Sequence, residues 1–150
     1  MSKRLTIGSA LRSFRALPAK IRLLATDAYK VSMAAGGRPG EDETFYLSYR
    51  SQRALLVPVD LKELVETFIP RDATDEDIAS AVKEARRQGL MATKEMFQIL
   101  RDGVIRFDYV APKGTWVCPR EPVLTLSGPS FLLSWLEPML IGTVSYLLQV

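Results

Sequence analysis

Apolar side chains recur at two different periods along the chain, and each period predicts one type of element. Spacings of three and four residues predict a helix over residues 61–68, which Pro70 ends. Alternation predicts a strand over residues 45–49, "FYLSY", entered from the turn-rich stretch "GGRPGEDE". The apolar positions of the helix are Leu61, Leu64, Val65 and Phe68.

Two more helices are predicted between residues 74 and 101. Thr74 or Asp75 can cap the first, acids fill its first turn, and two arginines precede Gly89. Its narrow apolar stripe indicates packing against one neighbour. The second, over residues 94–101, ends before Gly103, and its Met and Phe side chains are expected in the core rather than in a cofactor site. The apolar positions of the two helices are Ile78, Val82 and Ala85, then Met96, Phe97 and Leu100.

Three short strands are predicted after these helices, in "VIRFDYVAP" (104–112), "GTWVCP" (114–119) and "PVLTLSG" (122–128). Proline and glycine separate them. Because helices and strands follow one another without a regular βαβ alternation, the predicted fold class is α+β.

The stretch from Phe131 to Val150 is strongly apolar and contains one charge, Glu137. Polar residues and Pro138 dilute it and no basic flank is present, so we expect a buried helix rather than a membrane span, with Glu137 in a structural pair. The sequence stops within this helix, so we expect the front part of a larger folding unit, or a chain that pairs with one.

Positive charge is concentrated at the start of the sequence, although the 150 residues carry a net charge of only +3. Six of the 20 basic residues and no acidic residue lie in residues 1–26, which leaves 14 basic and 17 acidic side chains in the rest. Three interpretations stay open for this arm: a solvated, partly ordered extension, an organelle transit peptide, or a phosphate-contacting arm.

Residue types exclude several kinds of catalytic site. The sequence has one cysteine, Cys118, and no histidine. An internal disulfide framework, the usual zinc ligand sets, and Ser-His-Asp or Cys-His catalysis within these 150 residues are therefore excluded. Cys118 is expected to fill space in the core and suits a reducing compartment.

The stretch "LLATDAYKVSM" (23–33) is interpreted as a strand that passes into a capped helix. Asp27 can accept hydrogen bonds from the first backbone N–H groups of that helix, and Thr26 competes for the same role. An aromatic side chain, Tyr29, and then Lys30 follow within three residues. The local sequence allows Tyr29 either to lie in the core or to contact a ligand, and Lys30 is expected to be solvated.

Four stretches, taken together, resemble the N-terminal region of the nicotinate and nicotinamide phosphoribosyltransferases. They are "LLATDAYKVSM" (23–33), "ETFYLSYR" (43–50), "TDEDIASAVKEARRQGLMATKEMFQIL" (74–100) and "GTWVCPREPVLTLSGPSFLLSWLEPMLI" (114–141), and they follow the family's order. Lys113 departs from the family pattern, which has an acid in that turn. The resemblance lies within residues 23–150, which leaves 1–22 as the basic arm. It implies an α+β N-terminal phosphoribosyltransferase domain over 23–130 and a helix over 131–150 that leads into an α/β barrel.

The resemblance implies a reaction in which a pyridine carboxylate or carboxamide displaces pyrophosphate from phosphoribosyl pyrophosphate. ATP and Mg²⁺ are implied for the complete enzyme and no cofactor for these residues. The family's phosphate-binding loops and phosphorylated histidine lie in the barrel. These 150 residues contain neither a histidine nor a glycine-rich phosphate cradle, so we expect no turnover from them alone and assign no catalytic residue.

The resemblance gives three residues a role in substrate binding. Tyr29 would stack on the pyridine ring in the partner subunit's site, and Asp27 would lie near it besides capping its helix. Arg50, after the strand "FYLSY", would bind phosphate across the dimer interface, against the alternative of a surface arginine beside Arg53.

We therefore expect part of a nicotinate phosphoribosyltransferase-like enzyme of NAD salvage, a cytoplasmic homodimer or one piece that pairs with a separate barrel chain. The helical insert favours nicotinate over nicotinamide, and no nucleic acid or membrane is expected as a partner. The alternative is a non-catalytic binding or assembly subunit that docks its apolar C-terminal helix on a barrel chain. A small unrelated domain is the third hypothesis.

Overall fold

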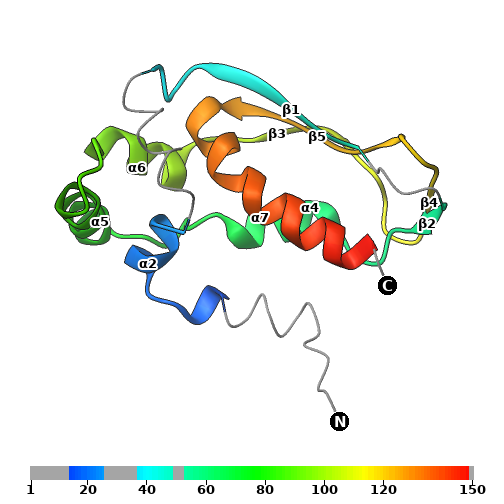
Figure 1. Ribbon diagram of the computed structural model, residues 1–150, viewed down its shortest axis with the longest axis horizontal. Coiled ribbons are helices and arrows are strands. Elements are labelled where there is room, and N and C mark those ends of the chain that lie inside the picture. The colour runs from blue at the N-terminus through cyan, green and yellow to red at the C-terminus, as the bar shows by residue number, and fades with distance from the viewer. Residues whose placement is uncertain (1–13, 26–36, 49–52, 149–150) are drawn as a thin grey trace, which may run out of the picture.

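The chain folds as α+β, as the sequence predicts. The computed structural model describes residues 14–25, 37–48 and 53–148, and its elements are drawn in Figure 1. The helices are α2 (Ala19–Leu23), α4 (Leu61–Phe68), α5 (Asp75–Arg87), α6 (Lys94–Asp102) and α7 (Ser130–Leu148). The strands are β1 (Asp42–Ser48), β2 (Leu55–Leu56), β3 (Arg106–Val110), β4 (Trp116–Val117) and β5 (Pro122–Pro129).

The main sheet has the strand order β1-β5-β3 and is antiparallel throughout. Central β5 places Leu126 opposite both Phe45 and Phe107, so these three side chains share one face of the sheet. Helices α4 and α7 lie on that side (Figure 1). The opposite face carries exposed tyrosines and a polar network.

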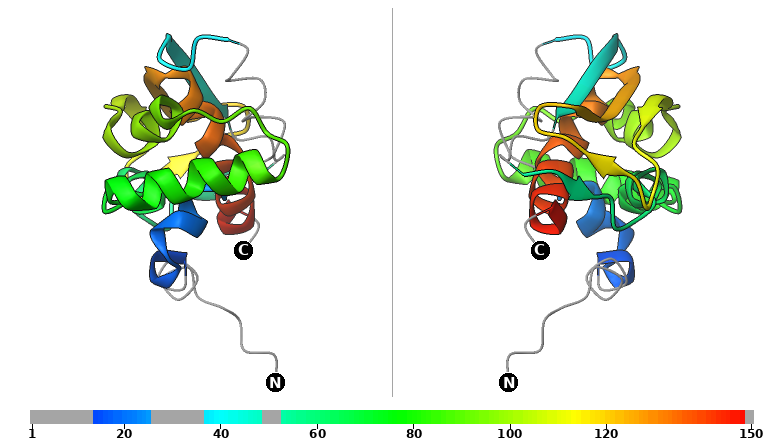
Figure 2. Two further views of the ribbon diagram at one scale, coloured as in Figure 1. Left: turned by 90° about the vertical axis from the view of Figure 1, so that its left-hand side faces the viewer. Right: turned by 90° about the vertical axis from the view of Figure 1, so that its right-hand side faces the viewer.

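A second, two-stranded sheet pairs β2 with β4. Strand β4 lies within a predicted strand, whereas β2 was not predicted, because two residues are too few to establish a period. The pairing places Leu56 opposite Trp116, and both side chains are exposed, while Val117 is buried. This ribbon lies at the opposite end of the molecule from α5 (Figures 1 and 2).

The helices predicted over residues 61–68 and between residues 74 and 101 are confirmed, and their first turns are fixed by local hydrogen bonds. The helix predicted after Asp27 lies outside the described residues. Asp60 caps α4 by accepting a hydrogen bond from the N–H of Glu63 at 3.2 Å. At α5, Thr74 and Asp77 form a reciprocal capping box, so Thr74 rather than Asp75 is the cap. Thr93 caps α6 in the same way as Asp60 caps α4. These contacts explain why the helix boundaries could be read from the sequence.

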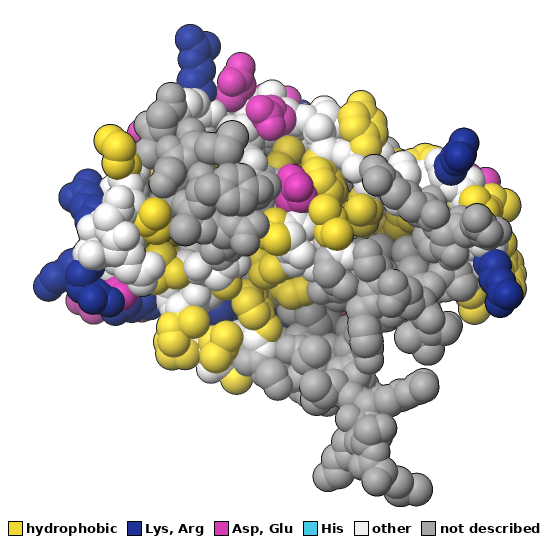
Figure 3. All heavy atoms as spheres, in the orientation of Figure 1, with side chains coloured by type: hydrophobic (Ala, Val, Ile, Leu, Met, Phe, Trp, Pro, Cys, Tyr) yellow, Lys and Arg dark blue, Asp and Glu magenta, His cyan; other side chains and the backbone are white. Residues whose placement is uncertain are grey.

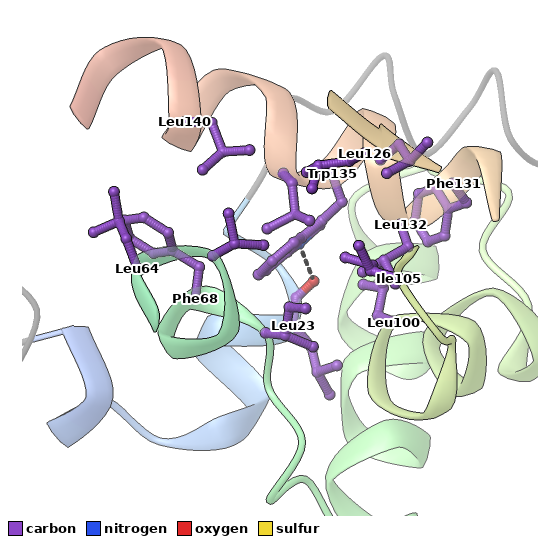
Figure 4. Close-up of a cluster of buried hydrophobic side chains, with 14 of the residues drawn as sticks. Leu23, Leu64, Phe68, Leu100, Ile105, Leu126, Phe131, Leu132, Trp135 and Leu140 are labelled. Carbon is purple, nitrogen blue, oxygen red and sulfur yellow. Dashed lines mark hydrogen bonds between the residues drawn. The ribbon is translucent and has the colours of Figure 1, made fainter. Parts of the chain in front are cut away.

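The core lies between the sheet and the helices, and the first part of α7 is its centre. Trp135, Leu136 and Leu140 are fully buried there, as are Met96 and Phe97 of α6. Figure 4 shows Trp135 between side chains from α4, β5 and α6, with its indole directed at the backbone of Leu23. Residues 131–140 thus confirm the buried helix that the apolar run predicts. No helix in the described ranges combines the length and apolarity that crossing a membrane would require.

Two expectations from the sequence are wrong. Leu23 ends helix α2 and Leu24 is its C-cap, so this apolar pair does not form a strand. Leu23 is buried because α2 packs against α5 and meets Trp135 of α7, and an apolar run alone cannot distinguish such helix packing from burial in a sheet. Cys118 is exposed rather than part of the core, because it follows the short strand β4 in a turn.

Candidate functional site

The three predicted binding residues fall outside the described residues. Asp27 and Tyr29 belong to residues 26–36, together with Thr26 and Lys30, and Arg50 belongs to residues 49–52. The structure describes the chain that leads into each of these two segments. The described surroundings of these segments are the two approaches, and the described part of the chain also includes the open face of the main sheet, the one opposite α4 and α7.

The approach to the first segment is helix α2, which a buried arginine fastens to the core. Arg22 is only 4% exposed, although it belongs to the basic arm. Its guanidinium donates to both carboxylate oxygens of Asp72, at 2.8 and 2.5 Å, and its Nε donates to the carbonyl of Leu17 at 3.0 Å. The hydrogen bonds from Arg22 hold the pKa of Asp72 below its usual value. Arg22 is thus a structural residue, which composition could not show.

A second contact holds the end of α2. The indole Nε1–H of Trp135 donates to the carbonyl of Leu23 at 3.3 Å, inside the core (Figure 4). Leu23 itself is fully buried. Phe14 packs edge-on against Phe68, with ring centroids 5.5 Å apart. Residues 14–25 are therefore part of the packed structure, and Leu23 lies four positions before Asp27.

The approach to the second segment is β1. Its last described residue, Ser48, lies opposite Pro122 next to an irregularity in the register. Strand β1 carries the sequence "FYLS" of the predicted aromatic strand and pairs along its whole length with β5. Two of the stretches that carry the family resemblance are therefore neighbouring strands.

The open face of the sheet carries two exposed tyrosines in one cross-strand row. Thr125 of β5 lies opposite Tyr46 of β1 on one side and opposite Tyr109 of β3 on the other. Side chains directly opposite one another in an antiparallel sheet point to the same face. Tyr46 is 70% exposed and Tyr109 is 46% exposed, so no described residue covers either ring.

A polar network fills the adjacent row. Ser127, which is 4% exposed, donates a short hydrogen bond to the carboxylate of Asp108, and its Oγ lies 3.1 Å from Oγ1 of Thr44. Because the Ser127 proton is used on Asp108, the Thr44 hydroxyl is the donor in the second contact. Asp108 is the extra residue at a shift of register between Phe107 and Tyr109. A bulge of this kind re-aims one side chain, here the Asp108 carboxylate.

An ion pair closes the end of this row. Arg106 donates to both carboxylate oxygens of Asp42, at 3.1 and 2.8 Å. This contact lowers the pKa of Asp42 and raises that of Arg106. Asp108 also attracts the Arg106 guanidinium, more weakly than Asp42, and is the second carboxylate among the described residues of the face.

Sequence reasoning missed this face, although part of its signal was present. Alternation within "FYLSY" assigns Tyr46 to the side opposite Phe45. The matching position of Tyr109 depends on the bulge, which reverses the alternation after Phe107 and has no local signature. Only the pairing of both strands with β5 brings the two tyrosines to one row.

Two other residues considered in the sequence, Glu137 and Lys113, lie within the described part of the chain. Glu137 is half-buried on α7, and Lys113 is exposed in the turn before β4. Among the residues with described positions, no group of three or more His, Cys, Asp or Glu side chains could hold a metal ion.

No protein-family model matches the chain, and no curated protein matches its sequence.

Proposed function

We propose that these residues form the N-terminal part of a nicotinate phosphoribosyltransferase-like enzyme. The complete enzyme would make nicotinate mononucleotide from nicotinate and phosphoribosyl pyrophosphate, for NAD salvage. The observation that carries the proposal is the joint packing of the stretches that resemble this family. β1 pairs with β5, and Trp135 donates to the carbonyl of Leu23, so three of the four stretches are in direct contact.

The remaining stretch, residues 74–100, forms α5 and most of α6 and belongs to the same unit. Ile78 and Ala81 of α5 and Phe97 of α6 are fully buried in the common core. Arg101 of α6 donates to Asp75 of α5 at 2.8 Å, which fixes the two helices relative to each other. A family N-terminal domain requires such a single unit, since its binding residues must be held in a fixed relation.

In this proposal the chain contributes binding groups and the remaining residues of the enzyme contribute the chemistry. Tyr29 would stack on the pyridine ring and Arg50 would hold phosphate oxygens with its bidentate guanidinium, both in the site of a partner subunit. Asp27 would lie beside them. The sequence has no histidine to be phosphorylated, and we propose no step through ATP or Mg²⁺ for these residues.

A second candidate is a non-catalytic assembly subunit that docks α7 on a separate barrel chain. The observation in its favour is Ile141, a large apolar side chain of α7 that is 45% exposed. The genomic context distinguishes the candidates. A barrel sequence that continues in frame favours one enzyme, whereas an adjacent, separate barrel gene favours a subunit.

The first experiment measures nicotinate mononucleotide formation by the purified 150-residue chain, alone and after mixing with a barrel region identified from the genomic context. We expect no product from the chain alone and product from the mixture or from the continuous protein. Turnover by the chain alone would refute the division of roles, and an inactive continuous protein would refute the proposed function.

The second experiment tests the binding residues in the active form. Tyr29→Ala should raise the KM for nicotinate about tenfold, which corresponds to roughly 1.4 kcal/mol of lost stacking energy. Arg50→Ala should raise the KM for phosphoribosyl pyrophosphate by at least about tenfold. Trp116→Ala and Arg87→Ala are matched controls, since both side chains are exposed and belong to other elements. Equal effects of control and test variants would contradict the assignment.

A further inference from the structure

The open face of the main sheet has the components of a second binding site, which the proposed enzyme function does not use. Tyr46 and Tyr109 flank Thr125, and Asp108 lies next to Tyr109 in the chain. In Figure 3, acidic side chains lie beside hydrophobic ones along the upper edge of the molecule, where β1 runs in Figure 1. The spacing of the tyrosines and the charge beside them determine which ligand this face can bind.

The spacing of the two rings fits a compact group held between them. Neighbouring strands are about 4.8 Å apart, so the backbones of Tyr46 and Tyr109 are separated by about 9.6 Å across β5. With both rings upright on the sheet, a group above Thr125 would lie midway between them, about 4.8 Å from each by this ideal spacing. That is inside the limit of about 6 Å at which a cation is attracted by an aromatic face. Thr125 is a short side chain and leaves this space open.

The charges of the face favour a cation over an anion. Among the described residues of this face, Asp42 and Asp108 supply two carboxylates and Arg106 supplies one guanidinium, which is hydrogen-bonded to Asp42 and also attracted by Asp108. Asp108 is exposed, and the buried hydroxyl of Ser127 holds its carboxylate in place. Tyrosine faces carry negative partial charge as well. A phosphate or a nucleic acid would meet net repulsion from the described charges of this face. A quaternary ammonium group would be attracted by the Asp108 carboxylate and by the faces of Tyr46 and Tyr109.

We propose that this face binds a small quaternary ammonium ligand. Tyr46 and Tyr109 form the walls of the site, Thr125 forms its floor, and Asp108 is the counter-ion. Thr44 and Ser127 orient the carboxylate from behind, through the chain of hydrogen bonds that ends on Asp108. The site is open to solvent on one side, so the affinity is expected in the millimolar range.

The test is an NMR titration of the ¹⁵N-labelled chain with choline, compared with 3,3-dimethyl-1-butanol. The two probes have the same shape and differ only in the charge of the central atom. Choline should shift the amide signals of Tyr46, Thr125 and Tyr109 in a saturable way, and the neutral alcohol should bind at least about threefold more weakly. Equal binding of both probes, or shifts that map to another face, would overturn the proposal.

Variants separate the two kinds of attraction. Tyr46→Leu and Tyr109→Leu keep an apolar side chain but remove the aromatic face, and each should weaken choline binding about two- to fivefold. Asp108→Asn keeps an acceptor for Ser127 and removes the negative charge. It should therefore weaken the binding of choline and leave the binding of the neutral alcohol unchanged. Trp116→Leu is the control, because this exposed aromatic residue lies on the other sheet. A loss of binding in Trp116→Leu equal to that in the tyrosine variants would refute the site.

Discussion

The ion pair between Arg22 and Asp72 gives the most direct test of how the start of the chain is fastened to the core. The side chain of Arg22 is 5% exposed, whereas that of Asp72 is 67% exposed. Replacing Asp72 by alanine therefore removes an accessible side chain and creates almost no cavity. What it leaves behind is a buried guanidinium without its carboxylate. We expect Asp72→Ala to destabilise the protein far more than a typical surface substitution.

The magnitude follows from the geometry. Removing one partner of a fully buried ion pair costs about 3–5 kcal/mol, and a single hydrogen bond to a charged group contributes about 1.5–3 kcal/mol. Asp72 is largely exposed, so water reaches part of the guanidinium in the variant, and Leu17 still accepts from its Nε. We expect a cost of about 2 kcal/mol. For a chain of this length, that lowers the Tm by roughly 4–8 °C.

The assay is thermal unfolding followed by circular dichroism at pH 7. Arg22→Met keeps an apolar stem in the buried position and removes the charge that needs a partner. In that background Asp72→Ala should have almost no effect, so the double-mutant cycle should give a coupling energy of about 2 kcal/mol. Asp42→Ala is the matched control, since Asp42 and Arg106 are both exposed, and it should leave the Tm essentially unchanged.

The pH dependence provides an independent check. Hydrogen bonds from Arg22 lower the pKa of Asp72 from its ordinary value of 3.8. A carboxyl group with a lowered pKa in the folded state contributes its stability above the unfolded value, and loses it as the pH falls through the folded value. The difference in Tm between wild type and Asp72→Ala should therefore persist from pH 7 to about 4 and shrink below that. The reasoning is refuted if Asp72→Ala and Asp42→Ala have equally small effects, or if Arg22→Met fails to suppress the effect of Asp72→Ala.

Two further predictions concern the core and the central strand. Trp135→Phe leaves the buried carbonyl of Leu23 without its donor and also removes part of a fully buried ring, so it should cost at least about 1–3 kcal/mol in urea unfolding followed by circular dichroism; an unchanged midpoint would contradict this. Gly128→Ala in β5 would place a Cβ 2.9 Å from the backbone carbonyl oxygen of Val104, and the resulting strain should cost about 1–3 kcal/mol. Gly89→Ala has no atom within 4 Å of its Cβ, so thermal unfolding of both variants separates crowding from the backbone strain of a positive φ.

The candidate binding residues could be predicted from the sequence only through their resemblance to a family. The sequence allows Asp27, Tyr29 and Arg50 to be equally a cap, a core aromatic and a surface arginine, and no periodicity distinguishes these local roles from ligand contact. Their positions lie outside the described residues, so their function stays a prediction. The role of Arg22 could not be predicted either. Nothing in a basic, acid-free arm indicates that one of its arginines forms a buried ion pair with a residue fifty positions later.

The sequence by itself determined the elements whose signals are local. Caps, helical spacing and glycine or proline stops lie within a few residues of one another, so α4, α5 and α6 could be located with their buried faces. Only the tertiary structure decided which strands are neighbours, that β5 is central, that β2 exists, and that Cys118 is exposed. These features depend on contacts between residues far apart in the chain. The free energy that selects such contacts comes from burying the shared core, and no local period of the sequence records it.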